Sequence, residues 1–340
     1  MDDPDMKKPL DTFDLAVEVS RGSDETDKLG ARLARYHTAK TRALLNLETL
    51  KVLKPVDDFT AARYRAGAVR LADCGNYLAF RQYYTVGKTR LHKAGFCKQH
   101  LICPLCAIRR GAKTLDVYLK RYRFVTDKNP SWRLSMITLT VKNGDDLAER
   151  FNHLQKSVAR IFKHRRDYLD KGRGKTEFRK IHGYVGTYEV TKDNGYGELK
   201  ETGWHPHAHI MVLHTTSFDY KALQAEWKEI TGDSHVLNVT AAKHPNEPEL
   251  DFLEVFKYAV KFSDLEPMEN IQAWDVLRAR RLLFSGGAFR GVVVPDDLED
   301  EPLDGLPYIE LFYRHTQHGY SLVSTGAGGC EVYGAEHATG

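Results

Sequence analysis

Hydrophobic and polar positions alternate through the middle of the chain in a pattern that predicts a β-sheet interrupted by helices. Four runs of apolar and β-branched residues predict strands, at 135–141 (SMITLTV), 183–191 (GYVGTYEVT), 204–213 (WHPHAHIMVL) and 235–241 (HVLNVTA). Apolar residues three or four positions apart predict helices between and after these strands, at 147–161, 219–230 and 253–262. This order predicts an α+β fold in which a central antiparallel sheet has helices packed on one face.

Helical patterns dominate the chain before residue 125. Segments rich in alanine and arginine, with apolar residues spaced near 3.6, predict helices within 28–72, and a further helix is expected near 111–124. We expect four regions along the chain: a disordered tail, a helical region with a cysteine-rich segment, the sheet domain and a C-terminal tail, at 1–27, 28–125, 126–315 and 316–340.

Charge is distributed unevenly along the chain, although its net value is only +4. Residues 1–27 carry nine acidic and three basic side chains, whereas residues 156–180 carry ten basic and three acidic ones. A basic middle between acidic ends indicates contact with a polyanion, and a solvated helix face is the alternative. No run of 18 apolar residues is present, and the N-terminus lacks the apolar core of a secretion signal, so we expect a cytoplasmic protein with no membrane partner.

Three histidines alternate along the strand WHPHAHIMVL, which places them on one face of the sheet. Imidazoles spaced in this way can converge on one divalent ion, so His207 and His209 are candidate ligands. If the hairpin turn is centred near residue 198, Glu189 lies opposite His207 and is a candidate third ligand. His205 is the rival third ligand, although Pro206 disfavours a regular strand beside it. The alternative is an exposed strand face that happens to be rich in histidine.

Four cysteines precede the predicted sheet, and a chain without a secretion signal favours metal ligation over disulfides. Cys74, Cys97, Cys103 and Cys106 could form a closed tetrahedral zinc site. His100 could replace Cys74 as a ligand. The alternatives are buried cysteines that fill a small core, or a redox pair, which is disfavoured because the βαβ context is missing.

A tyrosine lies on the last predicted helix with a carboxylate one turn before it. Glu254 and Tyr258 are four residues apart and therefore neighbours on a helix, and Lys257 and Lys261 flank the tyrosine. A phenol is a poor nucleophile at neutral pH unless a metal, a lysine or a base assists it, which suits this grouping to attack on a phosphodiester. Taken by itself, the helix is better explained by a core tyrosine beside a solvated ion pair of Glu254 with Lys257 or Lys261.

Taken in order, the segments SMITLTV, WHPHAHIMVL and EVFKYAVKFSD resemble the three motifs of the HUH endonuclease superfamily. The match is to plasmid rolling-circle replication initiators with a single active-site tyrosine. Their motifs are a TLT-type strand, a His-hydrophobic-His strand and a tyrosine helix, and similar initiators also carry a CxxC-type cluster before the first strand. The motifs span residues 135–264 here, and each constrains the position of the others.

This resemblance implies a chemistry for the site. A divalent metal, Mn²⁺ or Mg²⁺, on His207, His209 and a third ligand would polarise the scissile phosphate. Tyr258 would attack it, form a 5′-phosphotyrosine and release a 3′-OH that primes synthesis. Glu254 falls where the subgroup has a glutamate that activates water to end replication. The cysteine cluster would hold a structural Zn²⁺.

The implied partners are single-stranded or hairpin origin DNA, a host helicase and a host DNA polymerase, with a homodimer as a further possibility. Lysines and arginines near the motifs are the candidates for phosphate contacts: Lys156, Lys163, Arg165, Arg166, Lys257, Lys261, Arg280 and Arg281.

Three other functions fit some of these features. A transposase or a mobilisation relaxase would share the chemistry but not the biological role. A zinc-dependent DNA-binding regulator would explain the cysteines and the basic run, but not the histidine strand together with the tyrosine helix. A nuclease that activates water would leave no covalent adduct with DNA.

Overall fold

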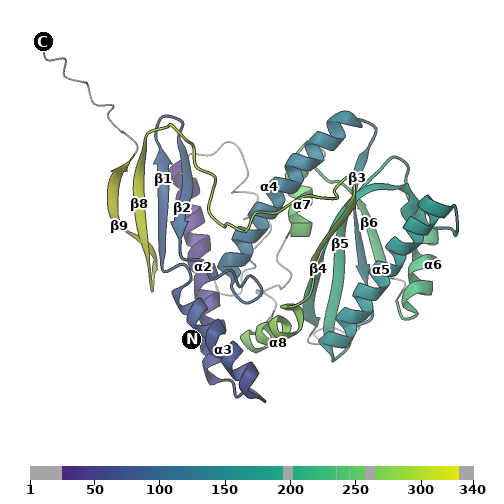
Figure 1. The fold of residues 1–340 in the computed structure, drawn as a ribbon, viewed down its shortest axis with the longest axis horizontal. Coiled ribbons are helices and arrows are strands. Elements are labelled where there is room, and N and C mark those ends of the chain that lie inside the picture. The colour runs from purple at the N-terminus through teal and green to yellow at the C-terminus, as the bar shows by residue number, and fades with distance from the viewer. Residues whose placement is uncertain (1–24, 194–201, 235, 245, 257–264, 329–340) are drawn as a thin grey trace, which may run out of the picture.

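The structure is a computed structural model that describes residues 25–193, 202–234, 236–244, 246–256 and 265–328. These residues form two separate antiparallel sheets with long helices between and beside them (Figure 1). No helix in this part of the chain is long and apolar enough to cross a membrane. The architecture confirms the α+β class.

The larger sheet has five strands in the order β6-β3-β5-β4-β7, and all neighbours are antiparallel. Its strands are β3 (Arg133–Thr140), β4 (Ile181–Asp193), β5 (Gly203–His214), β6 (Leu237–Ala241) and β7 (Leu283–Gly287). Four of them lie where the alternating pattern predicts them. His235, the first residue of the fourth predicted strand, lies outside the described residues. β7 was not predicted, because its sequence LFSGG is short and rich in glycine.

Helices cover both faces of this sheet, whereas the sequence pattern predicted them on one. α5 (Leu147–Lys171) and α6 (Tyr220–Thr231) lie on one side, and α4 (Pro104–Lys128) and α7 (Pro248–Phe256) lie on the other (Figure 1). α4 reaches the sheet from the N-terminal half of the chain, so local periodicity gave no sign of this contact. The side chains of β5 consequently alternate between two buried layers, as Ile210 and Val212 face α5 while Met211 and Leu213 face α4 and α7.

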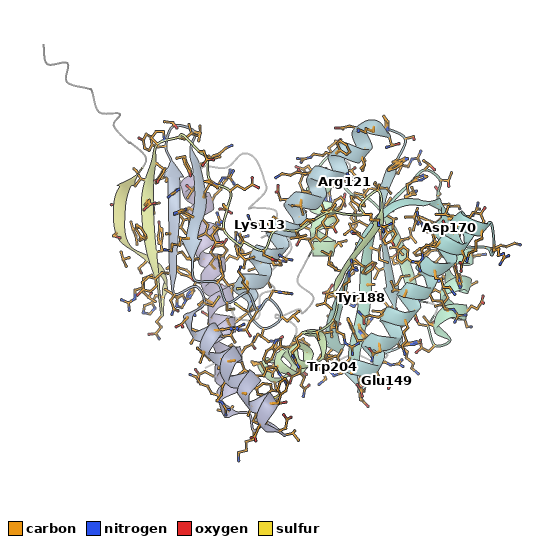
Figure 2. All side chains as sticks on the ribbon, in the orientation of Figure 1. Lys113, Arg121, Glu149, Asp170, Tyr188 and Trp204 are labelled. Carbon is orange, nitrogen blue, oxygen red and sulfur yellow. The ribbon has the colours of Figure 1, made fainter. Side chains whose placement is uncertain are left out.

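Helix α5 shows how local sequence sets an element of this fold. Its apolar residues recur every three or four positions and are buried against the sheet, among them Phe151, Leu154 and Val158. The Asp146 side chain accepts a hydrogen bond from the Glu149 amide at 3.0 Å and caps the first turn. Gly172 ends the helix with a φ of 63°, a left-handed conformation that glycine adopts without steric cost. Glu149 and Asp170 mark the two ends of the helix in Figure 2.

The smaller sheet has four strands in the order β2-β1-β8-β9. Its strands are β1 (Tyr77–Tyr83), β2 (Lys88–Ala94), β8 (Tyr308–Thr316) and β9 (Gly319–Gly328). None of these strands was predicted from the sequence. β1 and β2 fall in the segment assigned to cysteines, and β9 falls within the segment assigned to a C-terminal tail. β2 (KTRLHKA) is an edge strand in which basic residues hide the alternation of apolar positions.

The remaining helices join the two sheets into one molecule. They are α2 (Glu25–Val52), α3 (Asp58–Asp73), α8 (Pro267–Leu277) and the short 3₁₀ turn η2 (Glu177–Lys180). α2 and α3 occupy the range 28–72 in which helices were predicted and extend beyond it to Glu25 and Asp73. One continuous hydrophobic core includes Tyr36 of α2, Phe80 of β1, Leu105 of α4 and Ile210 of β5, so the two sheets share a core.

Candidate functional site

Two histidines and a glutamate meet on the sheet face that α4 and α7 cover. The pairing of β4 with β5 sets Glu189 opposite His207, the register that the sequence predicted, and sets Thr187 opposite His209. On the other side of β5, Thr138 of β3 is opposite His209. Because neighbours on one sheet face are about 5–7 Å apart, three central strands bring these side chains together.

The donor atoms of this group converge on one point. The Nε2 atoms of His207 and His209 lie 3.2 and 3.0 Å from the same oxygen, Oε2 of Glu189. The Glu189 side chain is 3 % exposed, and those of His207 and His209 are 11 % and 14 % exposed. Burial raises the pKa of Glu189, but hydrogen bonds from both histidines outweigh it and hold that pKa well below its usual range. The carboxyl is therefore an anion in a nearly dry site.

Both imidazoles are oriented through their second nitrogen. Nδ1 of His209 lies 3.1 Å from the Thr138 hydroxyl, and Nδ1 of His207 lies 3.4 Å from the carbonyl oxygen of His205. A carbonyl can only accept, so Nδ1 of His207 donates when the ring makes this contact, and a metal ion at Nε2 in place of the hydrogen bond to Glu189 would favour that tautomer. Metal-binding histidines are commonly fixed in this way. The sequence analysis missed Thr138, although the TLT motif that contains it was identified.

This donor set fits a divalent metal ion. One ligand atom from each of Glu189, His207 and His209 lies within 4.8 Å of the others. Ligands at about 2.1 Å from an ion and about 90° apart would be roughly 3.0 Å from one another, close to the observed spacing of nitrogen and oxygen. Two imidazoles and a carboxylate suit Mn²⁺, Fe²⁺ or Zn²⁺ and leave coordination positions open for substrate.

His205, the rival third ligand, lies on the same strand face but outside this group. Its ring centroid is 5.4 Å from that of His207, and its side chain is half-buried. The backbone carbonyl of His205 contacts Nδ1 of His207. Among the described residues, Glu189 belongs to the donor group, and His205 lies next to that group without being part of it.

The C-terminal end of α7 reaches the same sheet face. The Thr187 hydroxyl donates to the carbonyl oxygen of Val255 at 2.5 Å, and Thr187 is two residues from Glu189 along β4. Glu254 precedes that contact and is half-buried. Tyr258, Lys257 and Lys261 lie outside the described residues.

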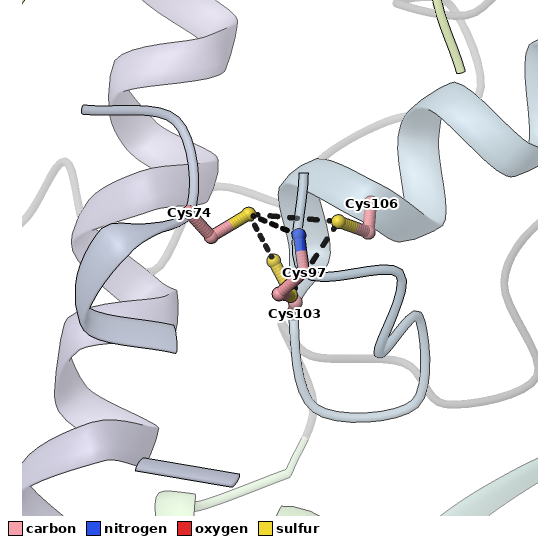
Figure 3. A group of neighbouring side chains, drawn as sticks. All are labelled: Cys74, Cys97, Cys103 and Cys106. Atoms are coloured by element: carbon pink, nitrogen blue, oxygen red, sulfur yellow. Dashed lines mark hydrogen bonds between the residues drawn. The ribbon is translucent and has the colours of Figure 1, made fainter. Parts of the chain in front are cut away.

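The four predicted cysteines form a second cluster at the start of α4 (Figure 3). Cys74 follows the end of α3, Cys97 follows β2, Cys103 caps α4, and Cys106 lies in its first turn. The Sγ atom of Cys74 is 3.6 Å from that of Cys103 and 3.5 Å from that of Cys106, and Cys97 and Cys106 are 3.6 Å apart. None of the four forms a disulfide. His100 is not part of the group.

The sulfur spacing matches tetrahedral zinc. Ligands at about 2.3 Å from a tetrahedral ion would be roughly 3.8 Å from one another, whereas a disulfide bond is about 2.05 Å long. Hydrogen bonds with Cys106, Cys74 and Cys97, together with burial, raise the pKa of the Cys103 thiol above its usual value. A bound cation would favour the thiolate form of all four cysteines, and this donor set fits such an ion.

A buried lysine, which the sequence analysis missed, lies beside this cluster. Lys40 of α2 is 1 % exposed, and its ammonium group donates to the carbonyl oxygens of Leu71 and Ala72 at 3.2 and 3.0 Å. Burial lowers the pKa of Lys40, and the nearby cysteine sulfurs raise it in part. Its place within a long alanine-rich helix gave no signal of this role.

The predicted basic residues are not gathered at the histidine site. Lys156, Lys163 and Arg166 are exposed on α5, which covers the opposite face of the sheet. The Arg165 guanidinium donates twice to the carbonyl oxygen of Ile181, at 3.1 and 2.6 Å, so it supports the start of β4.

Two further predicted arginines lie near the start of β7. Arg280 donates to the Asn152 side chain on α5, and Arg281 donates to the carbonyl oxygen of Leu283 at 3.1 Å. Both therefore make contacts within the protein at the edge of the larger sheet.

Comparison with known proteins gives one consistent family. A model of a replication protein family matches residues 88–312. A protein named Protein rep from a Bacillus species is 27 % identical over 68 % of this chain and 80 % of its own length. A Protein rep from Streptococcus pneumoniae is 28 % identical over 71 % and 75 %, and one from Bacillus amyloliquefaciens is 25 % identical over 74 % and 79 %. No solved structure matches the chain significantly.

Proposed function

Because this chain belongs to the replication protein family of rolling-circle initiators, we propose that it nicks one strand of its origin DNA through a tyrosine nucleophile. The product would be a 5′-phosphotyrosine and a free 3′-OH that primes rolling-circle synthesis. The observation that carries this proposal is the convergence of His207, His209 and Glu189 on one point, beside the strand that contacts the end of α7.

The three donors would hold Mn²⁺ or Mg²⁺, and the two imidazoles favour Mn²⁺. Such an ion acts as a Lewis acid on a phosphate oxygen and orients the phosphodiester. Glu189 contributes a negative charge that is fixed in place, because hydrogen bonds from both histidines keep its pKa low. Thr138 and the carbonyl of His205 keep the two rings aligned.

Tyr258 is the proposed nucleophile. Its phenol oxygen would attack phosphorus, the bond from phosphorus to the 3′ oxygen would break, and that oxygen would leave as a hydroxyl after it gains a proton. Tyr258 follows Val255 by three residues, a length of chain that spans at most about 11 Å. Val255 is bonded to the strand that carries Glu189, which supports this assignment.

Glu254 and the lysines beside Tyr258 complete the proposed site. Glu254 would activate water to release the DNA at the end of a replication cycle, in keeping with its position four residues before the tyrosine in the sequence. Lys257 and Lys261 would neutralise the phosphates next to the nick. Exposed Lys156, Lys163 and Arg166 on α5 would contact only DNA that passes around the sheet.

The cysteine cluster would bind a structural Zn²⁺ through Cys74, Cys97, Cys103 and Cys106. A closed site with four protein ligands leaves no position for substrate, so its contribution would be to the fold. It would join the ends of α3 and β2 to the first turn of α4, a helix that also packs against the α7 side of the larger sheet.

A nicking assay tests the metal site. Single-stranded oligonucleotides that cover the origin of its own replicon are incubated with the protein and Mn²⁺, and a polymerase then extends the 3′-OH. We expect cleavage at one position, a fall of at least about 100-fold for His209→Ala and Glu189→Gln, and wild-type cleavage for His153→Ala on α5. Tight binding without cleavage would replace the proposal with a DNA-binding regulator. Equal cleavage by all variants would remove the histidine site from the mechanism.

A further inference from the structure

The smaller sheet has an outer face that no helix of the described residues covers. In its register Leu78, Phe80 and Leu91 face α2, where they join the core. Tyr77, pairing with Arg314, must therefore face outward, because alternate residues of a strand lie on opposite faces. The loop that precedes β8 covers only one end of the outer face, where the Leu303 amide donates to the Tyr83 hydroxyl at 3.2 Å.

Two aromatic rings are exposed at the other end of this outer face. Tyr77 is 58 % exposed and Phe312 is 37 % exposed. Their positions are diagonal across β1 and β8, because Tyr77 pairs with Arg314 and Phe312 is two residues before it. The Arg314 guanidinium carbon lies 5.8 Å from the centroid of the Tyr77 ring. Diagonal neighbours are roughly 7–8 Å apart, which leaves each ring free to stack on a separate planar group.

The same face carries an excess of positive charge. The register places on it one carboxylate, Glu310, and five cationic residues from three strands: Arg81, Lys88, Arg90, Lys93 and Arg314. The excess equals the formal net charge of the whole chain, +4. Glu310 is bonded to Arg81 at 3.2 Å, and no carboxylate of the described residues forms an ion pair with Lys93 or Arg314.

An acidic segment near the sheet does not cancel this charge. Residues 296–301 hold five carboxylates, and most of them pair with basic residues of the helices. Asp297 lies 2.9 Å from Lys113 of α4, and Asp300 lies 2.6 Å from Arg109 of α4. Glu299 lies near His92 at the edge of β2, beside Lys93, so it offsets only part of the charge at that edge.

We propose that this outer face binds single-stranded DNA, with Tyr77 and Phe312 as stacking platforms and Arg314 and Lys93 as phosphate contacts. Unpaired bases present a flat surface to an aromatic ring, whereas bases of a duplex are already stacked on one another. The positive charge matches a polyanion rather than an apolar partner. The inference rests on the proposed function only for the source of the strand, which nicking and unwinding would supply. Tyr77 and Arg314 lie outside the residues that the family model matches.

Fluorescence anisotropy with a labelled 20-nucleotide thymidine oligomer tests this inference on the full chain. We expect Tyr77→Ala and Phe312→Ala each to weaken binding roughly tenfold, since stacking on one ring contributes on that order. Arg314→Ala should also make the plot of the logarithm of the binding constant against the logarithm of the salt concentration less steep, by nearly one unit of slope. Phe59→Ala and Arg70→Ala, which alter exposed residues of the same kinds on α3, are the matched controls and should bind as the wild type does.

Two further variants and a second assay separate stacking from folding and from nicking. Tyr77→Phe and Phe312→Tyr keep a ring and should keep binding, and cleavage of a short oligonucleotide that covers only the nick should be unchanged in every sheet variant. Wild-type binding by the alanine variants would overturn the inference, as would equal losses in the ring-conserving variants or a loss confined to duplex DNA. If the wild-type protein binds single-stranded DNA through the smaller sheet but does not nick its origin, the proposed function is wrong and the inference about the sheet still holds.

Discussion

Glu189 holds His207 and His209 together, because both imidazoles contact its buried carboxylate. Its carboxylate is buried to 3 % exposure, a position that is unfavourable for an isolated charge, and both imidazole Nε2 atoms contact one of its oxygens. A metal ion would replace these two hydrogen bonds by three coordination bonds to the same atoms.

The first prediction therefore concerns Glu189→Gln, a change that keeps shape and removes charge. We expect Mn²⁺ affinity, measured by isothermal titration calorimetry, to fall at least about 100-fold, because a neutral amide is a much weaker ligand for a hard cation. Glu226→Gln, a change at a half-buried carboxylate that also contacts a histidine, is the control and should leave the affinity unchanged. Equal Mn²⁺ affinity in Glu189→Gln would mean that Glu189 is not a ligand.

Individual site residues could be predicted from the sequence where their spacing alone determines which side chains lie together. Alternating histidines share a strand face, and counting back from a hairpin turn finds Glu189. The cysteines were found from their number and spacing. Thr138 and Lys40 were missed because a threonine in a strand and a lysine in a helix are ordinary residues until tertiary packing brings them to a site.

At the scale of elements, the loop between β7 and β8 is fixed by a buried charged group. Asp300 accepts hydrogen bonds from Arg32 at 3.0 Å, Arg109 at 2.6 Å and the Leu91 amide at 2.6 Å. Burial raises the pKa of Asp300, but the two arginines outweigh it and lower that pKa below its ordinary value. One carboxylate thus joins α2, α4 and β2 to the loop that leads into β8.

The second prediction follows from the sign of this pKa shift. A carboxyl whose pKa is lower in the folded state stabilises the protein above its unfolded pKa of about 3.9, and the contribution disappears as the pH falls through the folded pKa. Asp300→Asn should lower the free energy of unfolding by about 3 kcal/mol between pH 5 and 8, because two arginines lose their partner. Urea unfolding should show this difference shrinking below about pH 4. A difference that grows on acidification would contradict the assignment.

The elements that the sequence predicted are those with strong periodicity. β3, β4, β5, α5 and α6 are long and regular, and their cores are apolar. β1, β2 and β8 were missed because most of their outward residues are aromatic or charged, and β9 because it is rich in glycine and serine. In addition, β1 pairs with β8, which lies more than 200 residues away along the chain. α7 was placed near 253–262, whereas its described part spans Pro248–Phe256.

For the molecule as a whole, the continuous core implies that the two sheets unfold together. Leu105 and Cys106 at the start of α4 belong to the same core as the inner face of the smaller sheet and the α5 side of the larger one. A metal bound to the cysteines would therefore stabilise more than its own loop.

The third prediction is that Cys106→Ser releases about one equivalent of zinc and lowers the melting temperature of a single unfolding transition by roughly 10 °C or more. Calorimetry and elemental analysis measure the two effects. Glu189→Gln is the control, since it should leave the zinc content unchanged. A wild-type protein that contains no zinc, or a variant that melts in two well-separated steps, would contradict this view of the molecule.

The proposed mechanism requires Tyr258 to become covalently joined to the 5′ end of the cleaved strand. The most direct measurement is to incubate the protein with Mn²⁺ and an origin oligonucleotide labelled at its 3′ end, separate the products on a denaturing gel and map the labelled peptide by mass spectrometry. Tyr258→Phe is compared with Tyr84→Phe, which alters an exposed tyrosine in the turn between β1 and β2. We predict a labelled protein band whose DNA maps to Tyr258, absent in Tyr258→Phe and unchanged in Tyr84→Phe. Cleavage that leaves no adduct, or an adduct that persists in Tyr258→Phe, would contradict the claim.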